Sequence, residues 1–175
     1  MIRPGVPLRS ATLDSPLGPL LAVANDAGIV LLEFSEPARL SAQLQKLSRH
    51  FPEPVRPGPH PLLDRLRSEL LAYFSGERRA FSVPLIHPGT DFQRGVWTAL
   101  QQIPYGQTRT YEQLADTVGR AGACRAVGTA NGSNRLAILV PCHRVINKGG
   151  ALGGYGGGLW RKQRLLELEC GQTAL

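Results

Sequence analysis

The chain has 175 residues, enough for one domain of ordinary size or two small ones. Its composition is that of a soluble globular protein, and its longest apolar runs, such as GIVLLEF and LAILV, are too short to span a bilayer. The net charge of +7 and the calculated pI near 9.9 point to a polyanionic partner. The positive charge is unevenly distributed along the chain: residues 1–88 carry a net charge of +2 and residues 89–175 a net charge of +5.

The cysteine content indicates a reducing compartment. There are three cysteines, none in a CxxC spacing, so a disulfide framework and a structural zinc site are both disfavoured. The N-terminus, MIRPGVPLRS, lacks the apolar region of a secretory signal. We therefore expect a cytoplasmic protein with no metal and no cofactor.

The first half of the chain predicts an α+β domain, residues 1–88. Three segments alternate like strands, and an Asn-Asp-Ala-Gly turn links the last two: 9–14, 19–25 and 28–34. Ser35 is placed to cap a helix with apolar residues at helical spacing, and a second helix is expected over 62–74. The proline-rich stretch PEPVRPGPHP interrupts the chain between them. A short strand over 81–86 and a linker over 87–90 complete this half.

The second half, residues 89–175, predicts a helical domain. Two capping boxes, Thr90-x-x-Gln93 and Thr110-x-x-Gln113, each open a helix. GACRAVGTAN reads as a third, short helix, and its separation from the second by a Gly-containing turn suggests a helix-turn-helix.

The third helix is almost without bulky side chains. Small residues let a helix backbone approach closely, either to a neighbouring helix or to a narrow groove in which Arg125 is the one long side chain. The helix offers few base-reading polar residues for a major groove, so a minor-groove docking suits it better. Tight packing against another helix remains an equal alternative on composition.

The stretch PCHRV places a thiol beside an imidazole after an apolar run. Cys142 is either a small buried hydrophobe in a turn or a nucleophile with His143 as its base. Adjacent side chains of an extended segment point opposite ways, so the second interpretation needs a bent backbone or a bridging water. Glu167 and Glu169 on the last predicted helix, LWRKQRLLELE, are the nearest carboxylates to orient the imidazole.

Several motifs in order resemble one known family. PCHRV, together with FQRGVW, IPYGQTRTYEQLA, ACRAVGTANGSN and GGYGGGLWRKQRLLELE, closely resembles the O6-alkylguanine-DNA alkyltransferases between about residues 90 and 169. The first half is less similar, although SPLGPL and the strand pattern fit the family's variable N-terminal domain. The resemblance implies a ribonuclease H-like N-terminal sheet with helices and a winged-helix-like C-terminal domain.

The resemblance also implies roles for individual residues. Cys142 would accept the alkyl group, with His143 as its base, Glu169 hydrogen-bonded to His143, and Tyr111 rotating the nucleotide and donating to the base. Asn134 would tie the recognition helix to the active-site turn. The remaining implied contacts are with DNA, from Arg125, Tyr111, Ala126, Gly128, Asn131 and Arg120, and in the base pocket, from Val145, Tyr155, Gly156 and Ala137.

The implied activity is a single-turnover DNA repair reaction. The partner would be double-stranded DNA containing O6-alkylguanine, flipped out of the duplex, and the protein would act as a monomer away from membranes. Activity on O4-alkylthymine and cooperative binding along DNA stay open. Two alternatives compete: an alkyltransferase-like protein that binds lesions without repairing them, which the presence of Cys142 disfavours, and a Cys-His hydrolase, for which no oxyanion hole is specified.

Overall fold

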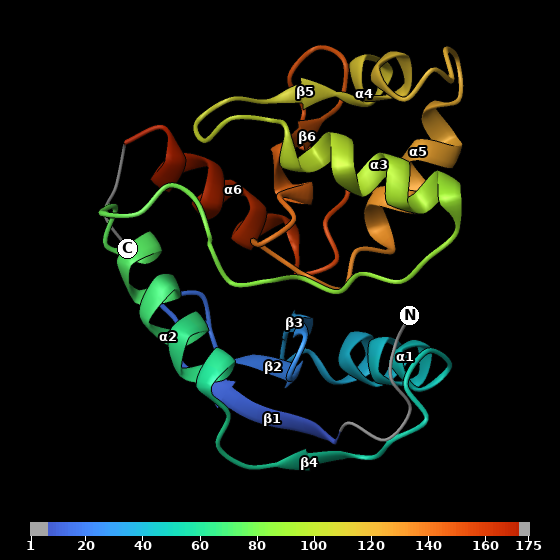
Figure 1. Cartoon of the computed structure of the whole chain (residues 1–175). Helices are drawn as coiled ribbons and strands as arrows, with labels where there is room; N and C mark the ends of the chain where they lie inside the picture. The colour runs from blue at the N-terminus through green and yellow to red at the C-terminus, as the bar shows by residue number, and fades with distance from the viewer. Residues whose placement is uncertain (1–6, 172–175) are drawn as a thin grey trace. The chain divides into compact units, whose positions relative to one another are not determined.

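A four-stranded sheet in the order β3-β2-β1-β4 forms the centre of the N-terminal unit (Figure 1). Neighbours β1-β2 and β2-β3 are antiparallel, and β4 runs parallel to β1. The strands span Leu8–Leu13, Leu20–Asn25, Gly28–Phe34 and Val55–Pro57. The computed structural model describes residues 7–171, and the chain divides into two compact units, Met1–His87 and Pro88–Leu175.

Two helices pack on this sheet. Helix α1 (Pro37–Ser48) contacts β3, and α2 (Pro61–Phe74) contacts β1, β2 and β3. A cluster of buried apolar side chains from β1, β2, β3 and α1 fills the interior; it includes Leu8, Val23, Val30, Leu31 and Leu47. The predicted mixed α+β class of this half is therefore confirmed.

Three local predictions for this unit were wrong or incomplete. Ser35 does not cap α1, because the helix begins at Pro37, whose fixed φ suits the first helical position, after Glu36. Residues 81–86 form no strand and make only a single bridge, Ile29 with Leu85. The proline-rich stretch contains the unpredicted β4, which is possible because prolines are tolerated on edge strands.

The C-terminal unit is mainly helical, as predicted. Its helices are α3 (Asp91–Gln101), α4 (Tyr111–Thr117), α5 (Cys124–Gly132) and α6 (Leu159–Glu169). Both predicted capping boxes are present, at Thr90 and at Thr110. A short parallel pair, β5 (Arg109–Thr110) and β6 (Val145–Ile146), joins the chain ahead of α4 to the segment after Cys142.

The helix-turn-helix consists of α4 and α5, which pack against each other and against α3. The connection between them turns through Gly119 and Gly122, whose φ values of 68° and 79° lie in the left-handed region that favours glycine. The Trp97 indole Nε1 of α3 donates to the Ala130 carbonyl oxygen at 2.9 Å and so fixes α5. Among residues 7–171, no helix has the length and apolar character needed to cross a membrane.

Candidate active site

The chain bends sharply where it delivers Cys142. Residues 136–140 form turns instead of a strand, and Ile138 has a φ of 70°, an uncommon value for a β-branched residue. Cys142–Arg144 then forms one turn of 3₁₀ helix after Pro141. This is the bent backbone that the adjacent thiol and imidazole required, and it turns both side chains into the protein, where Cys142 is 6% exposed and His143 is 0% exposed.

Asn134 holds this bend together. Its side-chain amide nitrogen donates to the Val140 carbonyl oxygen at 2.8 Å and lies 3.2 Å from the Cys142 sulfur. Its amide oxygen accepts from the Leu136 backbone N–H at 2.9 Å. Asn134 is 1% exposed and follows Ser133, the C-cap of α5, so it links that helix to the turn that carries Cys142.

A buried carboxylate lies behind the imidazole. The Nε2 atom of His143 is 2.8 Å from Oε1 of Glu169, and neither side chain is exposed. The Arg144 guanidinium donates to both oxygens of the same carboxylate, through Nε at 2.8 Å and Nη2 at 2.9 Å, and to the Ile103 carbonyl oxygen at 2.7 Å. Between the two carboxylate candidates, the structure therefore selects Glu169.

The electrostatics of this cluster favour a neutral imidazole beside an ionised carboxylate. Burial raises the pKa of Glu169, but hydrogen bonds and charge from His143 and Arg144 outweigh it and bring the pKa well below its usual range. Burial lowers the pKa of His143, against the opposing effect of Glu169. Since the carboxylate accepts at Nε2, Nδ1 carries the lone pair, and among residues 7–171 it has no hydrogen-bond partner.

Lys162 is a fully buried cation near the thiol. Its Nζ atom donates to the carbonyl oxygens of Val145 at 2.5 Å and Gly154 at 3.2 Å. Burial lowers its pKa to about 8, while the charge of a Cys142 thiolate opposes that shift. Arg161 likewise donates to the Gly157 carbonyl oxygen at 2.8 Å. These contacts explain why α6 begins with basic residues against its own dipole: they hold the glycine-rich segment in place.

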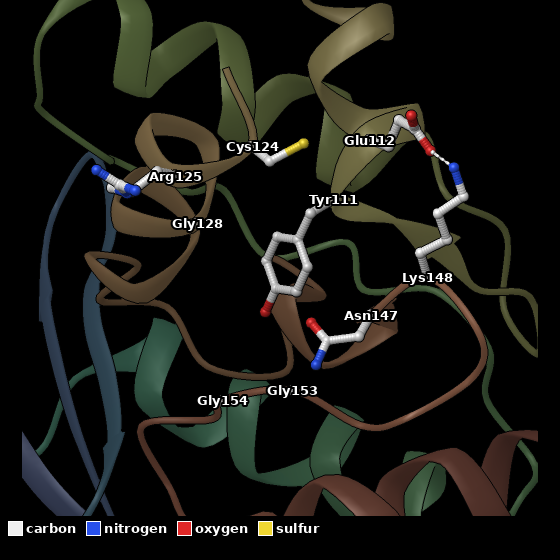
Figure 2. A pocket seen from close by; sticks show the side chains of 9 residues that line it. All are labelled: Tyr111, Glu112, Cys124, Arg125, Gly128, Asn147, Lys148, Gly153 and Gly154. Carbon is white, nitrogen blue, oxygen red and sulfur yellow. Dashed lines mark ion pairs between the residues drawn. The ribbon is translucent and has the colours of Figure 1, made fainter. Parts of the chain in front are cut away.

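An open cavity of about 540 Å³ lies next to this cluster, between α4, α5 and the segment after β6 (Figure 2). Tyr111 extends into its middle, and burial together with the nearby Cys142 charge raises the pKa of its hydroxyl. Tyr111 thus belongs to both the cavity and the surroundings of the thiol. The cavity is lined by Tyr111, Glu112, Cys124, Arg125, Gly128, Asn147, Lys148, Gly153 and Gly154.

The residues predicted to contact DNA from α5 and the turn before it differ in exposure. Arg125 and Gly128 line the cavity from α5, and Ala126 and Arg120 are exposed. Asn131 is 5% exposed, and its amide nitrogen lies 3.5 Å from the Cys142 carbonyl oxygen, so its position beneath the active-site turn does not support a DNA contact.

The four residues predicted for the base pocket do not line the cavity. Val145 and Ala137 are buried, Tyr155 is half-buried and Gly156 is exposed, and none of the four is among the lining residues. The cavity wall on this side is made instead by Gly153 and Gly154, which directly precede Tyr155 in the glycine-rich segment. A Cβ atom on Gly153 would lie 3.2 Å from the Tyr111 ring, so that close approach depends on glycine.

Sequence reasoning missed some residues of this region. The charge order on α6 was a signal for Lys162, but it did not distinguish that residue from its basic neighbours. Arg144 was visible only as a nearby positive charge. No local sequence pattern identifies three further cavity residues, because only the β5-β6 pairing brings their segments together: Glu112, Asn147 and Lys148.

Two family profiles match the chain. The profile described as 6-O-methylguanine DNA methyltransferase, ribonuclease-like domain, matches residues 8–86. The profile described as 6-O-methylguanine DNA methyltransferase, DNA binding domain, matches residues 91–171.

Similar proteins match over nearly their whole length. A methylated-DNA–protein-cysteine methyltransferase of Mycobacterium tuberculosis is 49% identical, over 90% of this chain and 90% of the relative. One of Methanosarcina barkeri is 42% identical, over 90% and 94%. The crystal structure of Mycobacterium tuberculosis OGT in complex with DNA is similar with a TM-score of 0.80 and 44% identity, over 96% of this chain and 95% of that one. The resemblance noted in the sequence is thus confirmed, and the chain belongs to the 6-O-methylguanine DNA methyltransferase family.

Proposed function

We propose that this protein repairs O6-alkylguanine in double-stranded DNA by transferring the alkyl group irreversibly to Cys142. The observation that carries the proposal is the buried thiol directly followed by His143, whose imidazole is held by Glu169 at 2.8 Å. The amide of Asn134, 3.2 Å from the sulfur, donates toward the atom that becomes negatively charged when the thiol ionises.

The first step is the formation of the thiolate. The lone pair of His143 Nδ1 accepts the Cys142 proton, which a bridging water molecule relays between the sulfur and the nitrogen. The ionised Glu169 stabilises the imidazolium that forms, and Arg144 holds that carboxylate in place through two hydrogen bonds. The positive charge of Lys162 favours the thiolate.

The second step is displacement at the alkyl carbon. The sulfur of Cys142 forms a bond to that carbon while the bond from carbon to O6 breaks, and the electron pair of the broken bond remains on guanine. Guanine takes up one proton and is restored. That proton is equivalent to the one that left the Cys142 thiol, so His143 returns to its neutral form. Tyr111, whose raised pKa keeps its hydroxyl protonated, is suited to donate a hydrogen bond to the base.

The product is a thioether, which ends the reaction. A thioether has no electrophilic carbonyl for water to attack, so no step regenerates the thiol. The repair proposal also fits the presence of the acceptor cysteine better than a lesion-binding role without transfer.

The burial of the thiol requires the base to leave the duplex. Cys142 is only 6% exposed, so O6 of a stacked guanine does not reach it. Rotation into the cavity beside Tyr111 brings the base toward the sulfur, and Arg125, exposed on α5, is the side chain suited to fill the vacated place. Unstacking costs a few kcal/mol, which such an insertion offsets in part.

We place the protein in the cytoplasm as a monomer. None of the three cysteines forms a disulfide with another residue in the range 7–171, which suits a reducing compartment. DNA is the only partner that the proposed reaction requires.

The site of transfer tests the proposal. The protein is incubated with a duplex carrying a labelled methyl group on O6 of guanine, and the labelled peptide is identified. Label is expected on Cys142, and Cys142→Ser is expected to abolish uptake while Cys124→Ser and Cys170→Ser retain it. Uptake that persists in Cys142→Ser would overturn the proposed acceptor.

A further inference from the structure

The rim of the cavity carries one ion pair, between the chain after β5 and the chain after β6. The Nζ atom of Lys148 lies 3.0 Å from Oε2 of Glu112, and Figure 2 shows this bond on the side of the cavity away from Arg125. Both side chains face solvent, at 81% exposure for Lys148 and 52% for Glu112. Among residues 7–171, Glu112 is also the only carboxylate that lines the cavity.

The pairing of β5 with β6 explains this contact. The parallel register joins Arg109 to Val145 and Thr110 to Ile146. Glu112, in the first turn of α4, and Lys148 each follow their strand by two residues, so the strand pairing brings their segments together. Lys148 lies in a tight turn closed by hydrogen bonds from the Asn147 N–H to the Ala151 carbonyl oxygen at 2.8 Å and from the Gly150 N–H to the Asn147 carbonyl oxygen at 3.1 Å.

We propose that Lys148 exchanges its partner when DNA binds, leaving Glu112 for a backbone phosphate beside the flipped nucleotide. This inference rests on the proposed function, because it takes the cavity as the place that the base enters. A nucleotide that enters there carries its two flanking phosphates past the rim, where Arg125 and Lys148 are the lining cations. An exposed ion pair contributes about 0–1 kcal/mol, so a phosphate can compete for the lysine at small cost.

Glu112 has a defined part in this exchange. In the free protein it holds Lys148 and so moderates affinity for any polyanion. Once a phosphate takes Lys148, the released carboxylate lies near the DNA backbone and opposes binding. Glu112 therefore limits the affinity of the cavity rim for DNA.

The test measures binding of a duplex containing one O6-methylguanine across a salt series, in a Cys142→Ser background where no transfer occurs. Lys148→Ala is expected to weaken binding and to reduce the salt slope by about one, the loss of one phosphate contact. Lys46→Ala is the matched control, since Lys46 is an exposed lysine in the other unit, and it is expected to leave both quantities unchanged. An unchanged slope in Lys148→Ala would overturn the exchange.

A double-mutant cycle separates exchange from simple repulsion. Glu112→Gln is expected to tighten binding by up to about fivefold, the equivalent of an exposed ion pair. If Lys148 is the group released, this gain is smaller in a Lys148→Ala background. An equal gain in both backgrounds would mean that Glu112 only repels DNA, and it would overturn the exchange. Methyl transfer to Cys142 is measured separately with Cys142 intact, so failure of the exchange is distinguishable from failure of the repair function.

Discussion

Lys162 is the residue whose contribution to the reaction is least visible in the sequence. Its ammonium group is buried, it is held by two backbone carbonyl oxygens, and its pKa is lowered by burial to about 8. At neutral pH it is mainly charged and favours the Cys142 thiolate. As the pH rises through about 8, Lys162 loses its proton and this contribution disappears.

We expect Lys162→Met to transfer the alkyl group about tenfold more slowly at neutral pH, which corresponds to about 1.4 kcal/mol. The measurement is the ratio of wild-type to variant rates across pH, which cancels effects common to both. The ratio should fall above about pH 8, to the value that reflects only the lost hydrogen bonds to Val145 and Gly154. Lys162→Arg keeps a charge that does not titrate in this range, so its ratio to Lys162→Met should stay above one at high pH. A wild-type to Lys162→Met ratio that does not vary with pH would contradict the electrostatic role.

Asn134 is a structural residue of the site with two kinds of partner. Asn134→Ala removes the bonds to Val140 and Leu136. The buried Leu136 N–H then loses its partner, while the Val140 carbonyl oxygen still accepts from the Cys142 N–H. We expect the free energy of unfolding to fall by about 1–3 kcal/mol, together with slower transfer, because the Cys142 turn loses its support. Denaturant unfolding and single-turnover kinetics measure the two effects. A stable variant with wild-type transfer would show that Asn134 does not support the turn.

For individual residues, the sequence indicated the thiol, imidazole and carboxylate of the site better than the residues that surround them. Cys142, His143 and Glu169 were identified through the motif and its resemblance, and the structure brings all three together. Asn134 was also placed correctly, beside Cys142. Lys162 and Lys148 could not be identified, since their roles depend on which carbonyl oxygen or carboxylate the fold brings near them. The burial of Asn131 could not be predicted either, because a polar residue on a short helix carries no local sign of which way it faces.

Helix α5 shows why small residues stand on a recognition helix. A Cβ on Gly128 would have the Tyr111 ring as its nearest contact, at 3.8 Å, which is ordinary van der Waals contact. Tight packing between helices therefore does not require glycine there. This favours the other explanation for the small residues, that they let DNA approach the helix backbone closely.

Two substitutions at Gly128 distinguish these explanations. Gly128→Ala is expected to stabilise the protein by about 0.5–1 kcal/mol through helix propensity, with duplex binding nearly unchanged. Gly128→Leu is expected to retain the fold but weaken duplex binding by tenfold or more, on the order of 1.4 kcal/mol, because its side chain fills the approach to Tyr111. Thermal unfolding and duplex titration measure these effects. Equal duplex affinity in both variants would remove α5 from the DNA interface at this position.

Elements with local signals were predicted well, and elements set by distant partners were not. The capping boxes at Thr90 and Thr110 begin α3 and α4 as expected, and LWRKQRLLELE coincides with α6. By contrast, β4 and β6 exist because another strand lies beside them, β1 and β5 respectively. No local pattern in PEPVRPGPHP or in RVINKG specifies those partners.

For the molecule as a whole, two buried carboxylates, Glu169 and Glu33, respond oppositely to acid, while Glu69 in the N-terminal unit has a lowered pKa like that of Glu169. In the C-terminal unit the pKa of Glu169 lies below its unfolded value of 4.5, so its contribution to stability is present above that pH and lost as the pH falls through the folded pKa. In the N-terminal unit burial raises the pKa of Glu33 above 4.5, although Arg39 opposes it. Its contribution is therefore present below pH 4.5 and lost as the pH rises through the folded pKa.

We expect acidification below pH 4.5 to destabilise the C-terminal unit through Glu169, and Glu169→Gln to flatten that dependence. Glu33→Gln is the matched variant in the other unit and should flatten the opposite dependence above pH 4.5. Hydrogen exchange resolved by peptide follows each unit separately. The same pH profile for Glu169→Gln as for wild type would contradict the ion-pair account of the site.

The most direct measurement counts alkyl groups per protein molecule. The protein is mixed with a large excess of duplex containing O6-methylguanine, and intact mass and restored guanine are followed to completion. The account predicts one methyl group per chain, located on Cys142, with restored guanine equal to the protein present and no further reaction. Continued repair after every chain is methylated, or guanine restored without a methylated Cys142, would contradict it.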